Sequence, residues 1–313
     1  MPRWFTLILA VSVSACGAAS RPRVPGASGA NGPASPPAGW LVWVDEDAPR
    51  TTWLDADGTP RGTRAGVIVA AGHALWALQM RTREMKLPTC DQIEHAAGEA
   101  LAEPPGGETG HVTIAALVEL GGTQRLVLDD GADPEEHALA ALEQRTLVTA
   151  GLGPYVFVQQ FRSWDACGAH GNSEARARVF DVETGTEVAV VAPEDEPFTE
   201  TLRIEAAARL RAERPGTDDD ETAPEVAFGE PAVGASGISM RYGFQVGTCY
   251  ACGDGRWGSY TRLTTVPAAA LPGRLQRHAA VPPGVQAWLA SHPDARGVSE
   301  ARVDPSPFFE PAR

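Results

Sequence analysis

The sequence predicts a β-rich α+β fold, in which antiparallel sheets carry a few packed helices. Apolar runs recur in pairs around short turns that contain glycine, and such pairs are typical of β-hairpins. Only three stretches have the spacing and the end residues of helices. Because the predicted strands follow one another directly instead of alternating with helices, antiparallel sheets are favoured over a parallel sheet.

Strand signals dominate the first two thirds of the chain and return towards its end. Residues 66–78 form two apolar runs around Ala71-Gly72, and residues 111–130 form two runs around Gly121-Gly122. Strands joined by such short turns pair antiparallel. Further strands are predicted at residues 155–161, 175–192, 237–247 and 258–267, with a turn from Glu183 to Gly185 in the second of these ranges.

Three helices are predicted. Residues 134–145 begin with proline and two acids, which suit the first turn of a helix, and residues 198–216 end at Pro215-Gly216. Residues 283–293 give a third, short helix. The acidic stretch at residues 217–225 is interpreted as a solvated loop, because it lacks the spacing of acids around a central glycine that calcium loops have.

Residues 1–15 are predicted to be a secretory signal peptide. Arg3 precedes an apolar stretch from Trp4 to Val13, and small residues follow it. The apolar stretch is shorter than the roughly 20 residues that a membrane-spanning helix needs. We therefore expect this segment to be removed from the mature protein.

The four residues Val13 to Cys16 resemble the lipobox of bacterial lipoproteins. The resemblance implies that Cys16 becomes the first residue of the mature protein and carries a lipid anchor. The alternative is an ordinary signal peptide whose cleavage site is followed by a cysteine. Gly17 in place of aspartate favours the outer membrane, so the protein is expected in the cell envelope as a lipoprotein that faces the periplasm or the cell surface.

The remaining chain is predicted to consist of a tether and a large folded part. Residues 16–39 are nearly all Gly, Ala, Pro and Ser, which is typical of a flexible linker. The folded part is expected to divide into a β-rich region at residues 40–145 and an α+β region at residues 146–313. No linker marks the soft boundary near residue 145.

The charge excludes several classes of partner. The net charge is −14, Lys86 is the only lysine, and the arginines are scattered along the chain. Nucleic-acid binding needs a concentrated basic face, and so does adhesion to anionic lipid headgroups. We therefore expect membrane attachment only through the lipid, and no nucleic-acid partner.

Two motifs resemble the extracytoplasmic domain of the anti-sigma factor RsiV and related bacterial lipoproteins. They are CGAHGN at residues 167–172 followed by FDVETG at residues 180–185, and the closing segment from residue 238 to residue 271. The resemblance covers about residues 150–275 and implies an extracytoplasmic α+β fold. In the best-known member it also implies recognition of lysozyme, so an envelope or extracellular protein is the expected partner. No segment for holding a sigma factor is visible, so anti-sigma activity is not carried over.

Four cysteines besides Cys16 bear on the chemistry. In an exported protein, Cys90, Cys167, Cys249 and Cys252 predict two disulfides, with three possible pairings. The alternative is a zinc site made by Cys167, His170, Cys249 and Cys252, which would leave Cys90 unpaired. Redox catalysis by Cys249-x-x-Cys252 is disfavoured, because glycines follow the motif where a helix would have to activate the thiolate.

No catalytic residue is predicted. The serine-hydrolase elbow, the zinc-protease helix motif and the phosphate-binding loop are all missing from the sequence. The acid pair Asp129-Asp130 is interpreted as solvated capping groups rather than as glycosidase carboxylates. A candidate binding surface is formed by the aromatic residues near the cysteine motifs, which are Trp164, Tyr250, Trp257 and Tyr260.

The sequence thus predicts a non-catalytic, lipid-anchored envelope protein without a cofactor, acting as a binding or structural module. The first alternative is an envelope protein that binds zinc through the four ligands named above. The second is an enzyme whose site has no recognisable local motif.

Overall fold

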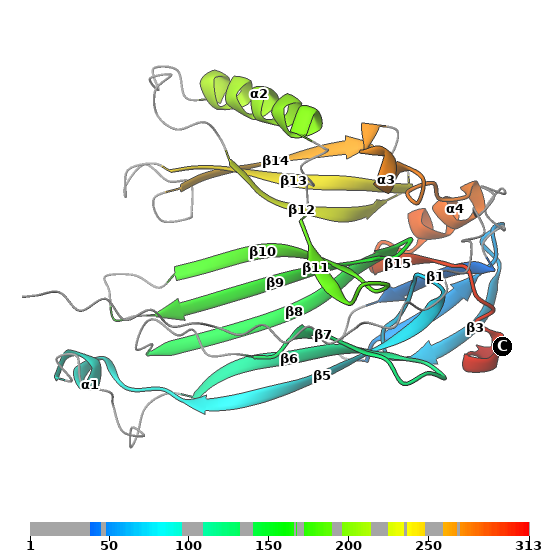
Figure 1. Ribbon diagram of the computed structural model, residues 1–313, viewed down its shortest axis with the longest axis horizontal. Coiled ribbons are helices and arrows are strands. Elements are labelled where there is room, and N and C mark those ends of the chain that lie inside the picture. The colour runs from blue at the N-terminus through cyan, green and yellow to red at the C-terminus, as the bar shows by residue number, and fades with distance from the viewer. Residues whose placement is uncertain are drawn as a thin grey trace, which may run out of the picture. The chain divides into compact units, whose positions relative to one another are not determined.

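The structure is a computed structural model that describes residues 38–44, 48–95, 109–131, 140–165, 167, 172–189, 196–213, 225–234, 237–247, 259–267 and 270–312 (Figure 1). The chain divides into two compact units, residues 1–35 and residues 36–313, and all described residues belong to the second unit. The predicted signal peptide, Cys16 and the linker up to residue 37 lie outside the described residues. Within the described part, no helix combines the length and the apolar character needed to cross a membrane.

Most of the described strands belong to one sheet of 13 strands. Its main path runs in the order β11-β10-β9-β8-β15-β1-β2-β3-β16, and β4 to β7 branch from this path. The strands are β1 (Gly39–Val44), β2 (Arg50–Leu54), β3 (Pro60–Ala65), β4 (Ile68–Ala71), β5 (Ala74–Lys86), β6 (Thr109–Glu119), β7 (Arg125–Asp129), β8 (Ala141–Leu152), β9 (Tyr155–Asp165), β10 (Asn172–Asp181), β11 (Thr186–Val188), β15 (Ala295–Ala301) and β16 (Glu310–Pro311).

A second sheet and several helices complete the described unit. The second sheet has three strands, β12 (Glu225–Gly234), β13 (Gly237–Gly247) and β14 (Ser259–Pro267). The helices are α1 (Cys90–His95), α2 (Glu196–Glu213), α3 (Gly273–Gln276) and α4 (Pro283–Ser291), with a 3₁₀ turn at Ser306–Phe308. One buried cluster contains Trp40 of the large sheet, Leu202 of α2 and Tyr242 of the small sheet, so these elements share a core.

The prediction of antiparallel sheets is correct for hairpin neighbours and incomplete for the large sheet, which is mixed. Strand β8 pairs parallel with β6 through His111 and Glu143, and parallel with β15 through Ser299 and Gly151. These partners are far from β8 in sequence. Because no tight turn joins them to β8, the turn geometry that forces an antiparallel pair does not apply.

The predicted hairpins are confirmed. Strands β4 and β5 pair around Gly72, β6 and β7 pair around Gly121, and β10 and β11 pair around Gly185. All three glycines have positive φ angles, which are 60°, 78° and 70° in that order. Glycine adopts this conformation without steric cost, so the turns that it marks in the sequence are also the turns of the structure.

The predicted helices at residues 198–216 and 283–293 are confirmed as α2 and α4. The helix predicted at residues 134–145 is wrong in its second half, because residues 141–145 form the start of β8; residues 132–139 lie outside the described residues. The buried side chains of Leu142, Thr146 and Val148 lie on the same side of a strand, and β9 pairs with β8 along its length. This pairing overrides the good helix propensity of the sequence Ala-Leu-Glu-Gln-Arg.

Strand β8 also crosses the boundary that was expected near residue 145. Residues 36–313 form one compact unit, and strands from both sides of residue 145 belong to the same sheet. The two halves join in one sheet because β15, near the end of the chain, inserts between β8 and β1. A contact of this kind between the two halves leaves no separate domains at residues 40–145 and 146–313.

His278 is a buried titratable group that the fold keeps neutral. Only 7% of its surface is exposed, and its ring fills the space above Gly153. The guanidinium of Arg302 lies 3.1 Å from its Nδ1 atom, and Arg277 Nε lies 3.1 Å from its Nε2 atom. Burial, followed by the charges of Arg302 and Arg277, lowers the pKa of His278 from 6.5 to about 4.

The depressed pKa predicts an acid-sensitive contribution to stability. The unfolded chain takes up the proton near pH 6.5 and the folded chain only near pH 4, so the contribution is complete above pH 6.5 and is lost as the pH falls towards 4. A shift of this size corresponds to at most about 3 kcal/mol. Urea denaturation at pH 7 and at pH 4.5 should show a smaller loss of stability for His278→Gln than for the wild type. Equal losses in both proteins would contradict the prediction.

Candidate functional site

An open groove lies on the large sheet where β5, β6, β8 and β9 come together. Its volume is about 740 Å³. It is lined by Thr82, Thr109, His111, Thr113, Ala141, Leu142, Glu143, Gln144, Arg145, Ser163, Trp164 and Asp165. A second hollow of about 280 Å³ shares Glu143, Arg145 and Ser163 with it and continues over β10. The two hollows together are called the sheet groove.

One row of polar side chains crosses the sheet groove from strand to strand. In the strand register, Glu84 is opposite His111, His111 is opposite Glu143, Glu143 is opposite Ser163, and Ser163 is opposite Ser173. Residues that are directly opposite each other on neighbouring strands present their side chains on the same face of the sheet. These five residues from five strands are called the polar row.

All five residues of the polar row are exposed. Within the part of the chain that the structure describes, none of their side chains makes a hydrogen bond or an ion pair, and the same holds for Arg145 beside them. A solvated sheet face also carries polar side chains. The polar row differs from a flat solvated face because four of its members, His111, Glu143, Ser163 and Ser173, line the two hollows. Their donors and acceptors therefore border a space that a ligand can occupy.

An exposed aromatic ring lies next to the polar row. Phe161 of β9 is opposite Arg145 of β8 and opposite Ala175 of β10, and 37% of its surface is exposed. It lines the smaller part of the sheet groove together with Ser163 and Ser173. The sequence analysis did not single out Phe161. Its signal was the alternation in β9, which places it on the face opposite to that of Trp164.

A disulfide between Cys90 and Cys167 lies next to the end of the sheet groove at Asp165. It joins the start of α1 to the segment after β9, with a Cα–Cα distance of 5.3 Å. The backbone N–H of Cys167 donates a hydrogen bond of 2.8 Å to Asp165, which lines the groove. The prediction that Cys90 and Cys167 are oxidised is thus confirmed, and of the possible partners of Cys167 the structure selects Cys90.

Trp164, predicted as part of a binding surface, lies at the same end of the sheet groove. Its ring packs against the buried residues Leu87, Val112 and Leu142, and the guanidinium of Arg162 lies 5.1 Å from the ring centre. Trp164 therefore supports the floor at this end. Tyr260 belongs to β14, in the other sheet, and its side chain is not described.

The other predicted site residues lie outside the described residues, and they are Cys16, His170, Cys249, Tyr250, Cys252 and Trp257. Among the residues that are described, no three His, Cys, Asp or Glu side chains lie close enough together to hold a metal ion. The sulfur of Cys167 is shared with Cys90, whereas zinc binds a free thiolate. The zinc alternative stays a prediction that would require this disulfide to be open.

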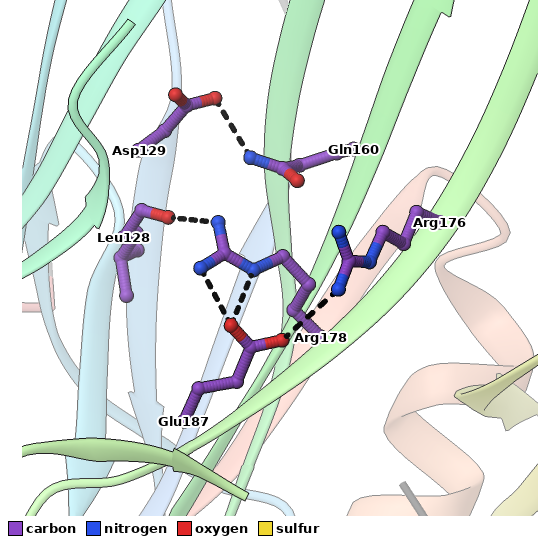
Figure 2. Close-up of polar contacts among 6 residues, drawn as sticks. All are labelled: Leu128, Asp129, Gln160, Arg176, Arg178 and Glu187. Carbon is purple, nitrogen blue, oxygen red and sulfur yellow. Dashed lines mark hydrogen bonds and ion pairs between the residues drawn. The ribbon is translucent and has the colours of Figure 1, made fainter. Parts of the chain in front are cut away.

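A second polar cluster, centred on Asp129, lies where β7 packs over β8 and β9. Only 5% of the surface of Asp129 is exposed, which corrects the interpretation of this residue as a solvated capping group. Its Oδ2 atom accepts hydrogen bonds from Gln144, Thr146 and Gln160 at 2.7, 2.7 and 2.8 Å. Its Oδ1 atom accepts the backbone N–H of Gly131 at 2.9 Å. Figure 2 shows the carboxylate pointing towards Gln160.

Arg178 of β10 extends this cluster (Figure 2). It donates to the backbone carbonyl of Leu128 at 2.7 Å and to Glu187 of β11 at 2.7 and 3.0 Å. Arg176 lies 3.9 Å from the same Glu187 carboxylate. Since these contacts link β7 to β8, β9 and β10 and link β10 to β11, we assign the cluster around Asp129 to holding the sheet together.

The disulfide is expected to contribute to stability. It closes a loop between residues 77 positions apart, so Cys90→Ser should lower the free energy of unfolding by about 2–4 kcal/mol. Urea denaturation followed by tryptophan fluorescence measures this change. Cys167→Ser and the double variant should give the same loss. Additive losses in the double variant would show that the two cysteines are not paired.

The carboxylate of Asp129 is expected to contribute more to the free energy of unfolding than an exposed carboxylate does. In Asp129→Asn an amide NH₂ replaces one oxygen and faces donors, so the free energy of unfolding should fall by about 2–4 kcal/mol. Asp294→Asn is the matched control, because Asp294 is exposed. Thermal denaturation of both variants compares them. Equal melting temperatures for the two variants would contradict the role assigned to Asp129.

Comparisons with known proteins give a distant likeness among solved structures. No family model matches this chain, and no curated protein sequence matches it. Among solved structures, the chain is similar to the crystal structure of a DUF3298 family protein from Pseudomonas aeruginosa PAO1, with 13% sequence identity, coverage of 63% of this chain and 92% of that chain, and a TM-score of 0.34. At this TM-score the likeness supports no conclusion about fold or function. The resemblance to RsiV-like domains stays a prediction.

Proposed function

We propose that this protein is a non-catalytic, lipid-anchored binding module of the cell envelope, and that the sheet groove is its binding site. The observation that carries the proposal is the polar row. Its five exposed side chains come from five strands, and within the described part of the chain they have no partner inside the protein. Polar groups that converge on a hollow without internal partners are typical of ligand sites.

The surroundings of the sheet groove also suit binding. The floor is built on paired strands, and the Cys90–Cys167 disulfide lies next to one of its ends, so the polar side chains start from a rigid frame. A site whose groups are held in place before binding loses less conformational entropy when a ligand arrives. This frame distinguishes the sheet groove from a mobile loop surface.

The predicted anchor and linker would place this site in the envelope. Cys16 would hold the protein at the membrane through its lipid, as the lipobox resemblance implies. A flexible linker of the length of residues 16–39 has an average end-to-end distance of about 25–30 Å. The sheet groove could then reach envelope or extracellular components beside the membrane.

The proposal predicts site-specific contact with an envelope component. In cells, a photoreactive diazirine residue at position 163 should give a cross-linked product of higher mass, whereas the same residue at position 183, in the exposed β10–β11 turn, should not. Cys16→Ser should release the protein from the membrane fraction and should abolish incorporation of a labelled fatty acid. The absence of any product specific to position 163 would refute the binding site, and unchanged lipid labelling would refute the anchor.

A further inference from the structure

We propose that the ligand of the sheet groove is a neutral oligosaccharide. This inference rests on the proposed binding function and adds the chemical class of the ligand. It follows from the charge balance of the groove, the kinds of hydrogen-bonding groups in it, the exposed ring of Phe161 and the pairing of the strands that form its floor.

The charges at the centre of the sheet groove oppose one another. Glu143 and Arg145 are both exposed residues on the same face of β8, two positions apart, and no acidic or basic run dominates the lining. The protein as a whole carries a net charge of −14, yet its groove does not share this excess. A polyanion or a strongly basic segment would leave one of these two charges facing a like charge, whereas a neutral ligand does not.

The hydrogen-bonding groups are of two kinds. His111, Glu143 and Arg145 offer planar groups with fixed donor and acceptor directions, and Ser163 and Ser173 offer hydroxyls that can donate and accept. Neighbouring hydroxyls of a sugar ring present a donor and an acceptor side by side. A planar carboxylate or guanidinium can therefore bind two of them at once.

Phe161 adds an apolar surface to this polar set. Its ring is 37% exposed beside Arg145 and Ser163, and it lines the smaller part of the sheet groove. Sugar rings have one face made of C–H groups, and such faces pack on aromatic rings. The combination of hydroxyls, planar polar groups and one aromatic ring thus matches both faces of a sugar.

The floor of the sheet groove disfavours a polypeptide ligand. An extended peptide binds most simply by adding a strand to a free sheet edge, and a helix binds in an apolar groove. At the polar row, β6 lies between β5 and β8, and β9 lies between β8 and β10. The described floor therefore offers a free edge only at its two ends, along β5 and β10, and its exposed side chains are mainly polar.

The length of the polar row indicates more than one sugar unit. Neighbouring strands lie about 4.8 Å apart, so a row across five strands spans roughly 19 Å. A single sugar ring would contact two or three members of the row. A chain of several sugar units would contact all of them.

Titration calorimetry with the full chain tests this inference, with N-acetylglucosamine hexamer and maltohexaose as two neutral probes. Wild-type protein should bind at least one of them, and Glu143→Ala/Arg145→Ala should weaken this binding at least tenfold. Glu183→Ala, a charge removal outside the groove, should change it less than twofold. Raising NaCl from 50 to 500 mM should also have little effect, because a neutral ligand has no charge to screen.

The outcomes separate this inference from the function on which it rests. No binding of either hexasaccharide, or binding that Glu143→Ala/Arg145→Ala leaves unchanged, overturns the oligosaccharide ligand. If the product specific to position 163 still forms in cells, the groove binds a ligand of another class and the proposed function stands. If that product is also absent, the proposed function falls as well.

Discussion

Along one edge, strand β8 has two successive neighbours, with an interval between them in which neither strand pairs with it. The large sheet depends on how the backbone groups of β8 in this interval find partners. At its start β8 pairs with β6, and at its end it pairs with β15, while β9 follows the opposite edge throughout. Backbone groups in the interval need other partners, because buried unpaired groups are costly. The Thr113 hydroxyl donates to the carbonyl of Gln144 at 2.9 Å, and the Trp43 indole donates to that of Val148 at 3.3 Å.

Asp129 adds side-chain hydrogen bonds in this interval. Its carboxylate binds side chains of β8 and β9 from β7, a strand that otherwise pairs only with β6. A buried carboxylate is tolerated when several donors satisfy it, and the loss of any donor is then expensive. Because β7 pairs with β6 at Asp129, the carboxylate ties β6 and β7 to β8 and β9.

Turns were predictable from the sequence, whereas features that depend on contacts between distant strands were not. The glycines at positions 72, 121 and 185 marked turns because their conformation is a property of the residue itself. The burial of Asp129 escaped the sequence because a bulge opposite Ala115 and Ala116 breaks the alternation of β7. Strict alternation would have placed Asp129 beside Val127, which is 48% exposed.

The candidate site shows the same difference between local features and contacts made by residues that are distant in the chain. The sequence by itself determined the turns, two of the helices, the excess of acidic residues and the presence of cysteines suited to disulfides. The tertiary structure decided that Cys90 pairs with Cys167, that β8 has parallel neighbours, and that Glu84, His111, Glu143, Ser163 and Ser173 form one row. These residues are distant in the chain, and their spacing in the sequence carries no sign of the row. Their alignment depends on the register of five strands, which is set only when the whole sheet forms.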